Sequence, residues 1–278
     1  MRVASPAGSA RAALSEAERT LARAGCDAPR LDAELLLAAV LGLDRAALYA
    51  DLERPIDGPA QRRFAALVAR RGAREPVAYI LGRRAFRHLT LHVDRRVLVP
   101  RPETELLVEA ALDLPERARV LDVGTGSGAV ALAVKQERPD LDVRGTDSSA
   151  AALAVARANG RRLGLDVCWS HADLLSGGDG GPDAVLANLP YVADWQLDGL
   201  APEVSRYEPR AALAAGPDGL ALLRRLCTQL EDVPRVALEV GDGQAPAVRE
   251  LVGAAGFALV QTRRDLAGLD RVVVGRRA

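Results

Sequence analysis

The segment from Arg119 to Val134 constrains the fold more strongly than any other part of the chain. An apolar run ends at Val123 and is followed by Gly124-Thr-Gly-Ser-Gly128, and then by a run of alanine, valine and leucine. This order predicts a buried strand, a tight turn and the beginning of a helix. Glycines let the backbone approach a ligand closely, and the first turn of a helix has free N–H groups. The segment therefore predicts a ligand-binding site at the end of a strand.

The spacing of these glycines restricts the kind of ligand. Gly-x-Gly-x-Gly differs from the Gly-x-Gly-x-x-Gly of dinucleotide-binding folds, and the Gly-Lys-Ser/Thr of a phosphate loop is missing. The next predicted strand, 142–147, ends in Asp147, where a carboxylate can accept the two hydroxyl groups of a ribose. A further apolar strand, 183–187, leads directly into Asn188-Leu-Pro-Tyr191. Together these features favour a ligand that contains adenosine.

The composition argues against several classes of protein. The chain has 278 residues, 49% of them hydrophobic, which is enough for one large or two modest domains. Its 37 basic and 37 acidic residues balance, so we expect no direct nucleic-acid substrate. Three scattered cysteines and three histidines argue against a disulfide framework or a metal site. Without a signal peptide or a membrane-length apolar run, we expect a cytoplasmic protein that does not associate with a membrane.

Residues 1–75 predict a small helical domain, because apolar residues recur there with helical spacing. Asp27 is expected to cap the second helix, with Leu31 on the apolar face of that helix. The last helix carries four arginines that we expect around its rim: Arg62, Arg63, Arg70 and Arg71. They form either a solvated face or a surface that recognises a macromolecular partner.

Residues 76–100 predict a β-hairpin that links two domains. Leu89, Leu91 and Val93 alternate with polar residues, and a second apolar run, 97–99, follows a turn-like segment. From 101 to 278, short apolar strands alternate with helices, which indicates an α/β fold with a mostly parallel, seven-stranded sheet covered on both faces. The last two strands are joined too tightly for a helical crossover, so we expect them to be antiparallel.

Seven motifs follow one another along the chain. They are Glu75-Pro-Val-Ala-Tyr-Ile-Leu-Gly82, Val99-Pro-Arg-Pro-Glu-Thr-Glu105, Leu121-Asp-Val-Gly-Thr-Gly-Ser-Gly128, Asn188-Leu-Pro-Tyr191, Tyr207-Glu-Pro-Arg210, Leu238-Glu-Val-Gly241 and Arg264-Asp-Leu-Ala267. This set resembles the HemK/PrmC family of protein N5-glutamine methyltransferases over nearly the whole chain. The resemblance implies a Rossmann-like, class I S-adenosylmethionine-dependent methyltransferase domain, residues 101–278, preceded by a helical substrate-recognition domain.

The same resemblance implies an activity and a partner. The family methylates the side-chain amide nitrogen (N5) of the glutamine in the Gly-Gly-Gln motif of class 1 peptide chain release factors, which modulates translation termination. S-adenosylmethionine supplies the methyl group and S-adenosylhomocysteine is the product. We therefore expect a cytoplasmic monomer whose substrate is a release factor.

The resemblance also assigns the catalytic residues. The Asn188 side-chain oxygen and the Leu189 backbone carbonyl are expected to accept the two N–H groups of the substrate amide, while Tyr191 packs on the planar amide beside Pro190. An amide nitrogen is a poor nucleophile because its lone pair is delocalised into the carbonyl. Acceptors that orient it and stabilise the positive charge that grows on it in the transition state are therefore important.

The remaining site residues follow from their positions in the motifs. The residues expected to bind the cofactor are Gly124, Thr125, Gly126, Ser127 and Gly128 at the methionine end, Asp147 at the ribose, Asp173 and Leu174 at the adenine, and Asn188. Arg101 and Glu103, with Thr104, lie in a segment that is expected to close the site over the substrate. Glu239 ends a predicted strand and either faces the site or pairs with an arginine.

One position departs from the family pattern, and three other functions compete. Family members usually have proline where Leu189 stands, although leucine retains the carbonyl and Pro190 keeps the backbone of Leu189 extended.

An adenine-N6 methyltransferase of nucleic acid uses a similar tetrapeptide, but it would need a basic groove and stacking aromatics, and only 3% of this chain is aromatic. An inactive methyltransferase-like binding module is disfavoured by the intact Asn188 and Pro190. A nicotinamide enzyme comes last because the glycine spacing differs.

Overall fold

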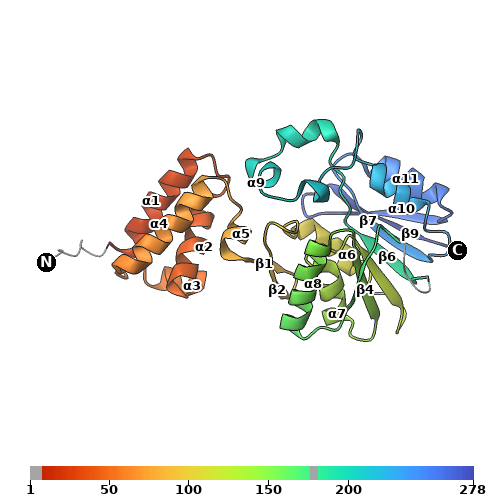
Figure 1. Ribbon diagram of the computed structural model, residues 1–278, viewed down its shortest axis with the longest axis horizontal. Helices are drawn as coiled ribbons and strands as arrows, with labels where there is room; N and C mark the ends of the chain where they lie inside the picture. Colours follow the sequence, from red (N-terminus) through yellow and green to blue (C-terminus); the bar gives the residue numbers. More distant parts are fainter. Residues whose placement is uncertain (1–7, 176–180) are drawn as a thin grey trace. The chain divides into compact units, whose positions relative to one another are not determined.

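The computed structural model describes residues 8–175 and 181–278, which divide into two compact units (Figure 1). The first unit contains the described residues up to Gly82 together with Ala201–Tyr207, and the second contains the described residues of Arg83–Leu200 together with Glu208–Ala278. Each unit has a hydrophobic core of its own. The first unit is therefore discontinuous in sequence.

The first unit is helical. Its elements are α1 (Ala10–Arg23), α2 (Pro29–Leu41), α3 (Arg45–Ala50), α4 (Gly58–Gly72), α5 (Val77–Leu81) and α9 (Pro202–Ser205). The side chains of Ser9, Asp44 and Asp57 accept backbone N–H groups at the beginnings of α1, α3 and α4, which is the usual role of N-cap residues. Leucines and Phe64 from α1, α2 and α4 fill the core between them.

Several expectations for this unit are wrong in detail. Residue Ala28, not Asp27, precedes the first turn of α2, and no side chain caps that helix. Leu31 is 40% exposed, because the buried face of α2 runs through Leu36 and Leu37. Arg71 is not on a solvated rim, since its side chain is only 6% exposed.

Arg71 is buried because carboxylates surround it. Its Nε donates to Asp32 of α2 at 2.6 Å, and its Nη1 donates to Glu203 of α9 at 2.7 Å. Arg74 donates twice more to Glu203, at 2.6 and 2.7 Å. A buried charge is tolerated when it is paired and hydrogen-bonded, as here. These contacts attach the short segment Ala201–Tyr207 to the helical unit.

The second unit is built on a seven-stranded sheet with the order β5-β4-β3-β6-β7-β9-β8. Its strands are β3 (Arg119–Val123), β4 (Asp142–Asp147), β5 (Cys168–His171), β6 (Ala184–Ala187), β7 (Arg235–Glu239), β8 (Leu259–Arg264) and β9 (Asp270–Arg276). The first five are parallel, whereas β9 is antiparallel to both β7 and β8. The expected mostly parallel sheet with an antiparallel final pair is confirmed.

Helices cover the sheet of the second unit on both faces (Figure 1). They are α6 (Glu105–Glu109), α7 (Ala129–Glu137), α8 (Ala150–Leu163), α10 (Ala221–Cys227) and α11 (Ala245–Ala254), with the 3-10 turns η1 (Pro102–Thr104), η2 (Asp194–Gly199) and η3 (Arg210–Ala212). The direction in which successive strands are added to the sheet reverses between β3 and β6. The strands β4 and β5 lie on one side of β3, whereas β6 and β7 lie on its other side. The crossover helices therefore fall on opposite faces.

The expected hairpin between 76 and 100 is only partly right. A two-stranded antiparallel pair does form, from β1 (Arg83–Phe86) and β2 (Leu89–His92), and it belongs to the second unit. Residues 77–81, however, are the helix α5, and 97–99 form no strand. Gly82 ends α5 in the left-handed conformation with φ of 66°, which a glycine adopts without strain.

Among the described residues, no helix is both long and apolar enough to cross a membrane.

Candidate active site

A pocket of about 200 Å³ lies at the carboxyl ends of the parallel strands. The loops that follow β3, β4, β5 and β6 all contribute to its wall. Ligands bind at this edge in open α/β sheets, where the strand order reverses. The expected residues that line the pocket are Gly124, Thr125, Gly126, Ser127, Asp147, Asp173, Leu174, Asn188, Leu189 and Pro190.

The glycine-rich turn can pass close to its neighbours only because it lacks side chains. Gly124 has φ of 72°, and a Cβ atom there would lie 3.0 Å from Cδ2 of Leu189. Gly128 has φ of 81°, and a Cβ atom there would lie 2.9 Å from the ring of Trp169. Both positions therefore require glycine. Gly128 does not line the pocket, and its place is at the beginning of α7.

Asp147 supports the turn from the end of β4. Its Oδ2 accepts the backbone N–H of Gly126 at 2.9 Å, and its Oδ1 accepts the N–H of Ser149 at 2.8 Å. A carboxylate can accept about four hydrogen bonds, so two acceptor positions remain for a diol in the pocket. Asp147 is therefore placed as expected for a group that binds ribose, and it also holds the turn in shape.

Two supporting residues were not found from the sequence. Asp122, which is 2% exposed, accepts the Thr125 hydroxyl at 2.6 Å and the Ala131 N–H at 3.1 Å, and burial raises the pKa of its carboxyl to about 6. Asn159 of α8 is fully buried and donates to the Ser127 and His92 carbonyls at 3.0 Å. A carboxylate within an apolar strand was a signal for Asp122. Asn159 had no comparable signal, because its partners are distant in sequence.

Of the two residues after β5 that were expected at the adenine, Leu174 is buried and Asp173 is exposed. Leu174 is buried against the pocket and has φ of 58°, a left-handed conformation that is strained for a leucine. Asp173 lines the pocket, but its exposed carboxylate also pairs with Arg225 at 2.6 Å. Leu174 can cover a flat ring, whereas Asp173 must share its oxygens between Arg225 and any ligand.

The tetrapeptide after β6 places its amide and its backbone in the pocket. The Asn188 Nδ2 donates to the Thr104 hydroxyl at 3.0 Å. Among the described residues, no donor bonds the Asn188 Oδ1, so this oxygen is available as an acceptor. Leu189 is 4% exposed, and both it and Pro190 line the same pocket.

Tyr191 lies beyond the pocket wall. Its backbone carbonyl accepts the Gln244 side chain at 2.9 Å, and its ring lies close to Gly241. Burial and the nearby Glu239 carboxylate raise the pKa of Tyr191 to about 12, so its hydroxyl stays protonated at neutral pH. Tyr191 can therefore present a flat surface or a hydrogen-bond donor, and it is not a base.

Arg101 and Glu103 do not line the pocket either. Arg101 donates to Glu208 at 2.7 Å. Glu208 is buried, and its burial raises the pKa of the carboxyl while Arg101 opposes the rise. This pair joins the segment before η1 to the segment that leads into η3, and η3 lines the pocket through Ala211 and Ala212.

Glu239, at the end of β7, takes neither simple role that the sequence suggested. Its carboxyl is 2% exposed and forms a side-chain hydrogen bond with Thr104, so its partner is a threonine and not an arginine. The other oxygen, Oε2, has no hydrogen-bond partner among the described residues. Burial raises the pKa of Glu239 to about 7.

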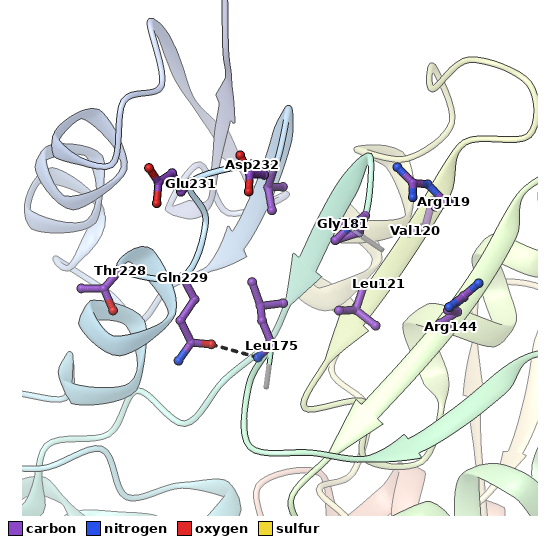
Figure 2. A pocket seen from close by; sticks show the side chains of 12 residues that line it. Arg119, Val120, Leu121, Arg144, Leu175, Gly181, Thr228, Gln229, Glu231 and Asp232 are labelled. Carbon is purple, nitrogen blue, oxygen red and sulfur yellow. Dashed lines mark hydrogen bonds between the residues drawn. The ribbon is translucent and has the colours of Figure 1, made fainter. Parts of the chain in front are cut away.

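A second hollow, of about 310 Å³, lies at the amino ends of β3, β6 and β7 (Figure 2). Arg119 and Arg144 point into this region, but each pairs with a carboxylate, Asp183 and Asp142 respectively. Gln229 accepts the N–H of Leu175 across it (Figure 2). Because both arginines already have partners and the hollow lies away from the carboxyl ends of the parallel strands, we place the active site in the smaller pocket.

The fold of the second unit matches solved methyltransferases. A methyltransferase from Pyrococcus furiosus covers 70% of this chain and 91% of its own length with a TM-score of 0.53 and 18% identity. The hMettl16 catalytic domain, in complex with the MAT2A 3′UTR hairpin 1, covers 83% of this chain and 85% of its own with a TM-score of 0.56 and 14% identity. Residues 102–203 match the family described as methyltransferase small domain. Fold and site together define a methyltransferase with a Rossmann-like catalytic domain.

Comparison of whole sequences is more specific. Residues 12–82 match the PrmC N-terminal domain. Release factor glutamine methyltransferases from Geobacter sulfurreducens and Cereibacter sphaeroides are 40% and 43% identical to this chain, covering 92% and 95% of it and 92% and 97% of their own lengths. That of Coxiella burnetii is 43% identical and covers 90% of this chain and 92% of its own. The chain belongs to the release factor glutamine methyltransferase family.

Proposed function

We propose that this chain transfers a methyl group from S-adenosylmethionine to the N5 side-chain nitrogen of the glutamine in the Gly-Gly-Gln motif of class 1 release factors. The observation that carries the chemistry is the Oδ1 of Asn188, which lies at the end of β6 in the wall of the pocket and is bonded by no donor among the residues that the structure describes. Relatives that are 40% to 43% identical over nearly the whole chain, and that are named for this substrate, support the choice of glutamine over a nucleic-acid base.

The pocket residues fit S-adenosylmethionine. The turn from Gly124 to Ser127 suits the methionine end, because its backbone is bare there. Asp147 retains two acceptor positions for the ribose hydroxyls, and buried Leu174 supplies an apolar wall for the adenine. When bound, the cofactor supplies an electrophilic methyl group on its sulfonium, and S-adenosylhomocysteine remains afterwards.

The tetrapeptide orients the nucleophile. The Asn188 Oδ1 accepts one N–H of the glutamine amide, and the Leu189 carbonyl accepts the other. Both oxygens then face the nitrogen as it becomes positive in the transition state, which is where acceptors have their largest effect. Tyr191, protonated at neutral pH, is suited to packing against the amide and not to taking its proton. The methylated nitrogen loses its proton to water after transfer, so no side-chain base is needed.

We assign the helical unit to recognition of the release factor. A glutamine side chain is small and common, so selection of one glutamine requires contacts elsewhere on the partner. Arg62 and Arg63 are exposed on α4 and provide a basic surface for such contacts. We further propose that the enzyme acts as a monomer in the cytoplasm, where release factors work.

The test is incubation of the purified protein with labelled S-adenosylmethionine and purified release factors, followed by mass mapping of the modified residue. We expect one methyl group on the glutamine of Gly-Gly-Gln and none in a factor with that glutamine replaced by alanine. A matched incubation with cellular RNA tests the adenine-N6 alternative. Label in RNA, with none in the release factor, would overturn the proposal.

A further inference from the structure

Three polar side chains from distant parts of the chain meet beside the active site. Asn188 follows β6, Glu239 ends β7, and Thr104 ends η1. The strands β6 and β7 pair in parallel with Ala187 opposite Leu238, so Asn188 and Glu239 occupy neighbouring positions at the same edge of the sheet. Thr104, which is 4% exposed, accepts the Asn188 Nδ2 at 3.0 Å, and its hydroxyl lowers the pKa of Glu239 as a side-chain hydrogen-bond partner.

The hydrogen bonds that run from Asn188 through Thr104 to Glu239 can have only one direction while Glu239 is ionised. A carboxylate only accepts, so the single proton of the Thr104 hydroxyl must be donated to Glu239. The Thr104 oxygen is then an acceptor toward Asn188, and it can be satisfied by Nδ2 but not by Oδ1. The observed bond from Asn188 Nδ2 to Thr104, at 3.0 Å, has this direction.

A flipped Asn188 amide would disrupt the hydrogen bonds of both Thr104 and Glu239. Its Oδ1 would face Thr104 and require the proton that Glu239 needs. Glu239 is 2% exposed, and its Oε2 already has no partner among the described residues, so its carboxylate would be left without hydrogen bonds. Buried polar groups without partners are costly, and this cost disfavours the flipped amide.

We propose that Thr104 and Glu239 are positioning residues that hold the Asn188 amide with Nδ2 toward Thr104 and Oδ1 toward the substrate nitrogen. The inference rests on the proposed function, because the orientation matters only if Asn188 receives a substrate N–H. Neither residue touches the reacting atoms, and both act through Asn188. A wrongly oriented amide would present an N–H to the substrate N–H, which repels it.

The arrangement links amide orientation to pH. Burial, together with the carboxylate of Glu103, raises the pKa of Glu239 to about 7, although the Thr104 hydrogen bond and the charges of Arg271 and Arg101 act to lower it. Tyr191, which also faces this group, remains protonated at this pH. Protonation of Glu239 gives it a donor of its own, so Thr104 is no longer forced to donate and the preference for one amide orientation weakens. Turnover should therefore fall as the pH drops through about 7.

The experiment compares Thr104→Val, which removes the hydroxyl at constant shape, with Thr104→Ser, which keeps it. On a purified release factor we expect Thr104→Val to lower kcat about tenfold or more, since small misplacements of reacting groups have effects of this order. The affinity for S-adenosylmethionine, measured by calorimetry, should change less than about twofold. Thr104→Ser should recover most of the lost kcat. Thr90→Val, at an exposed position on β2, is the matched control and should be neutral.

Glu239→Gln provides the second test. Glutamine can still accept the Thr104 hydroxyl through its amide oxygen but does not titrate, so its kcat should lose the fall near pH 7 that the unaltered enzyme shows. An unchanged pH profile in Glu239→Gln overturns the proposal, as does an unchanged kcat in Thr104→Val. If Thr104→Val fails to fold, the Glu239→Gln profile decides alone. The unaltered enzyme is assayed alongside, and its failure to methylate the release factor would instead refute the proposed function.

Discussion

The backbone N–H of Gly126 donates a hydrogen bond of 2.9 Å to the carboxylate of Asp147, so one side chain shapes the glycine turn and borders the pocket. We predict that Asp147→Ala weakens S-adenosylmethionine binding. Loss of a hydrogen-bonded charged partner costs about 1.5–3 kcal/mol, which corresponds to roughly ten- to a hundredfold in affinity. Isothermal calorimetry with the purified variant measures the change.

Asp142→Ala is the control for that experiment. Asp142 begins the same strand and makes an exposed pair with Arg144, far from the pocket end of β4. Its replacement should leave cofactor affinity unchanged. Unaltered affinity in Asp147→Ala would remove Asp147 from the cofactor site.

Asn188→Ala should nearly abolish methyl transfer while cofactor binding stays largely intact. The variant loses the Oδ1 acceptor but keeps the glycine turn and Asp147 in place. Removal of one charge-stabilising group from an active site lowers kcat by about 10²–10³. Single-turnover assays with saturating cofactor give the rate directly. Near-normal turnover would refute the assigned role of Asn188.

Leu189→Pro should retain activity within a few-fold of the unaltered enzyme. The group that matters at this position is the backbone carbonyl, which proline also has, and proline fixes the backbone more strongly. Leu189 is buried against Gly124, so the smaller ring removes some apolar contact. Steady-state kinetics on the release factor give the comparison, and a loss as large as that of Asn188→Ala would show that the leucine side chain itself is required.

Asp122→Asn should stabilise the folded protein at neutral pH. Burial raises the pKa of Asp122 from its ordinary 3.8 to about 6, so the folded state binds this proton more tightly than the unfolded state. The stabilising contribution is complete below about 4 and is lost as the pH rises through 6, a difference of at most about 3 kcal/mol. Asparagine can keep both the Thr125 and Ala131 contacts through one oxygen, because both donate to Oδ2.

Urea unfolding of Asp122→Asn and the unaltered protein at several pH values checks this. The free energy of unfolding of the variant should exceed that of the unaltered protein increasingly as the pH rises from about 4 to about 7. A constant difference across that range would show that Asp122 does not titrate in it.

Replacing Arg62 and Arg63 by alanine should reduce kcat/KM on an intact release factor but not on a short Gly-Gly-Gln peptide. Both side chains are exposed on α4, and charges at the edge of an interface mainly affect association. Arg70 and Arg71 are unsuitable for this test, because Arg70 pairs with Glu75 and Arg71 is buried between Asp32 and Glu203. The exposed pair Arg19 and Arg23, on α1, is the matched control. Equal losses on factor and peptide would assign these arginines no part in recognition.

The strands that form the parallel part of the sheet and the place of the pocket could be predicted from the sequence because their signals are local. The strands β3, β4 and β6 end where glycine or a polar residue interrupts an apolar run, and each end reaches the same edge of the sheet. A strand that ends in Asp147 or Asn188 needs no knowledge of distant residues to be recognised. Local signals failed at 77–81, where apolar and β-branched residues form a helix because Tyr79 and Ile80 are buried within the helical unit.

The surroundings of the site could not be predicted, because they depend on residues far apart in sequence. Thr104 gains its significance from Asn188 and Glu239, which no spacing rule connects. Arginine is usually a surface residue, and only the distant partners Asp32 and Glu203 explain why Arg71 is buried. Asn159 likewise holds Ser127 and His92 from a helix whose sequence shows only an amphipathic pattern.

The attachment of Glu203 to Arg71 and Arg74 bears on how the protein is made. A ribosome synthesises the chain from its N-terminus, so α1 to α5 leave it before Glu203 has been made. At that stage Asp32 is the carboxylate partner that is present for Arg71. Glu203 is synthesised only after the strands β1 to β6 of the second unit have been translated. The helical unit therefore reaches its final packing late, and the two units complete their folding in an interleaved order during translation.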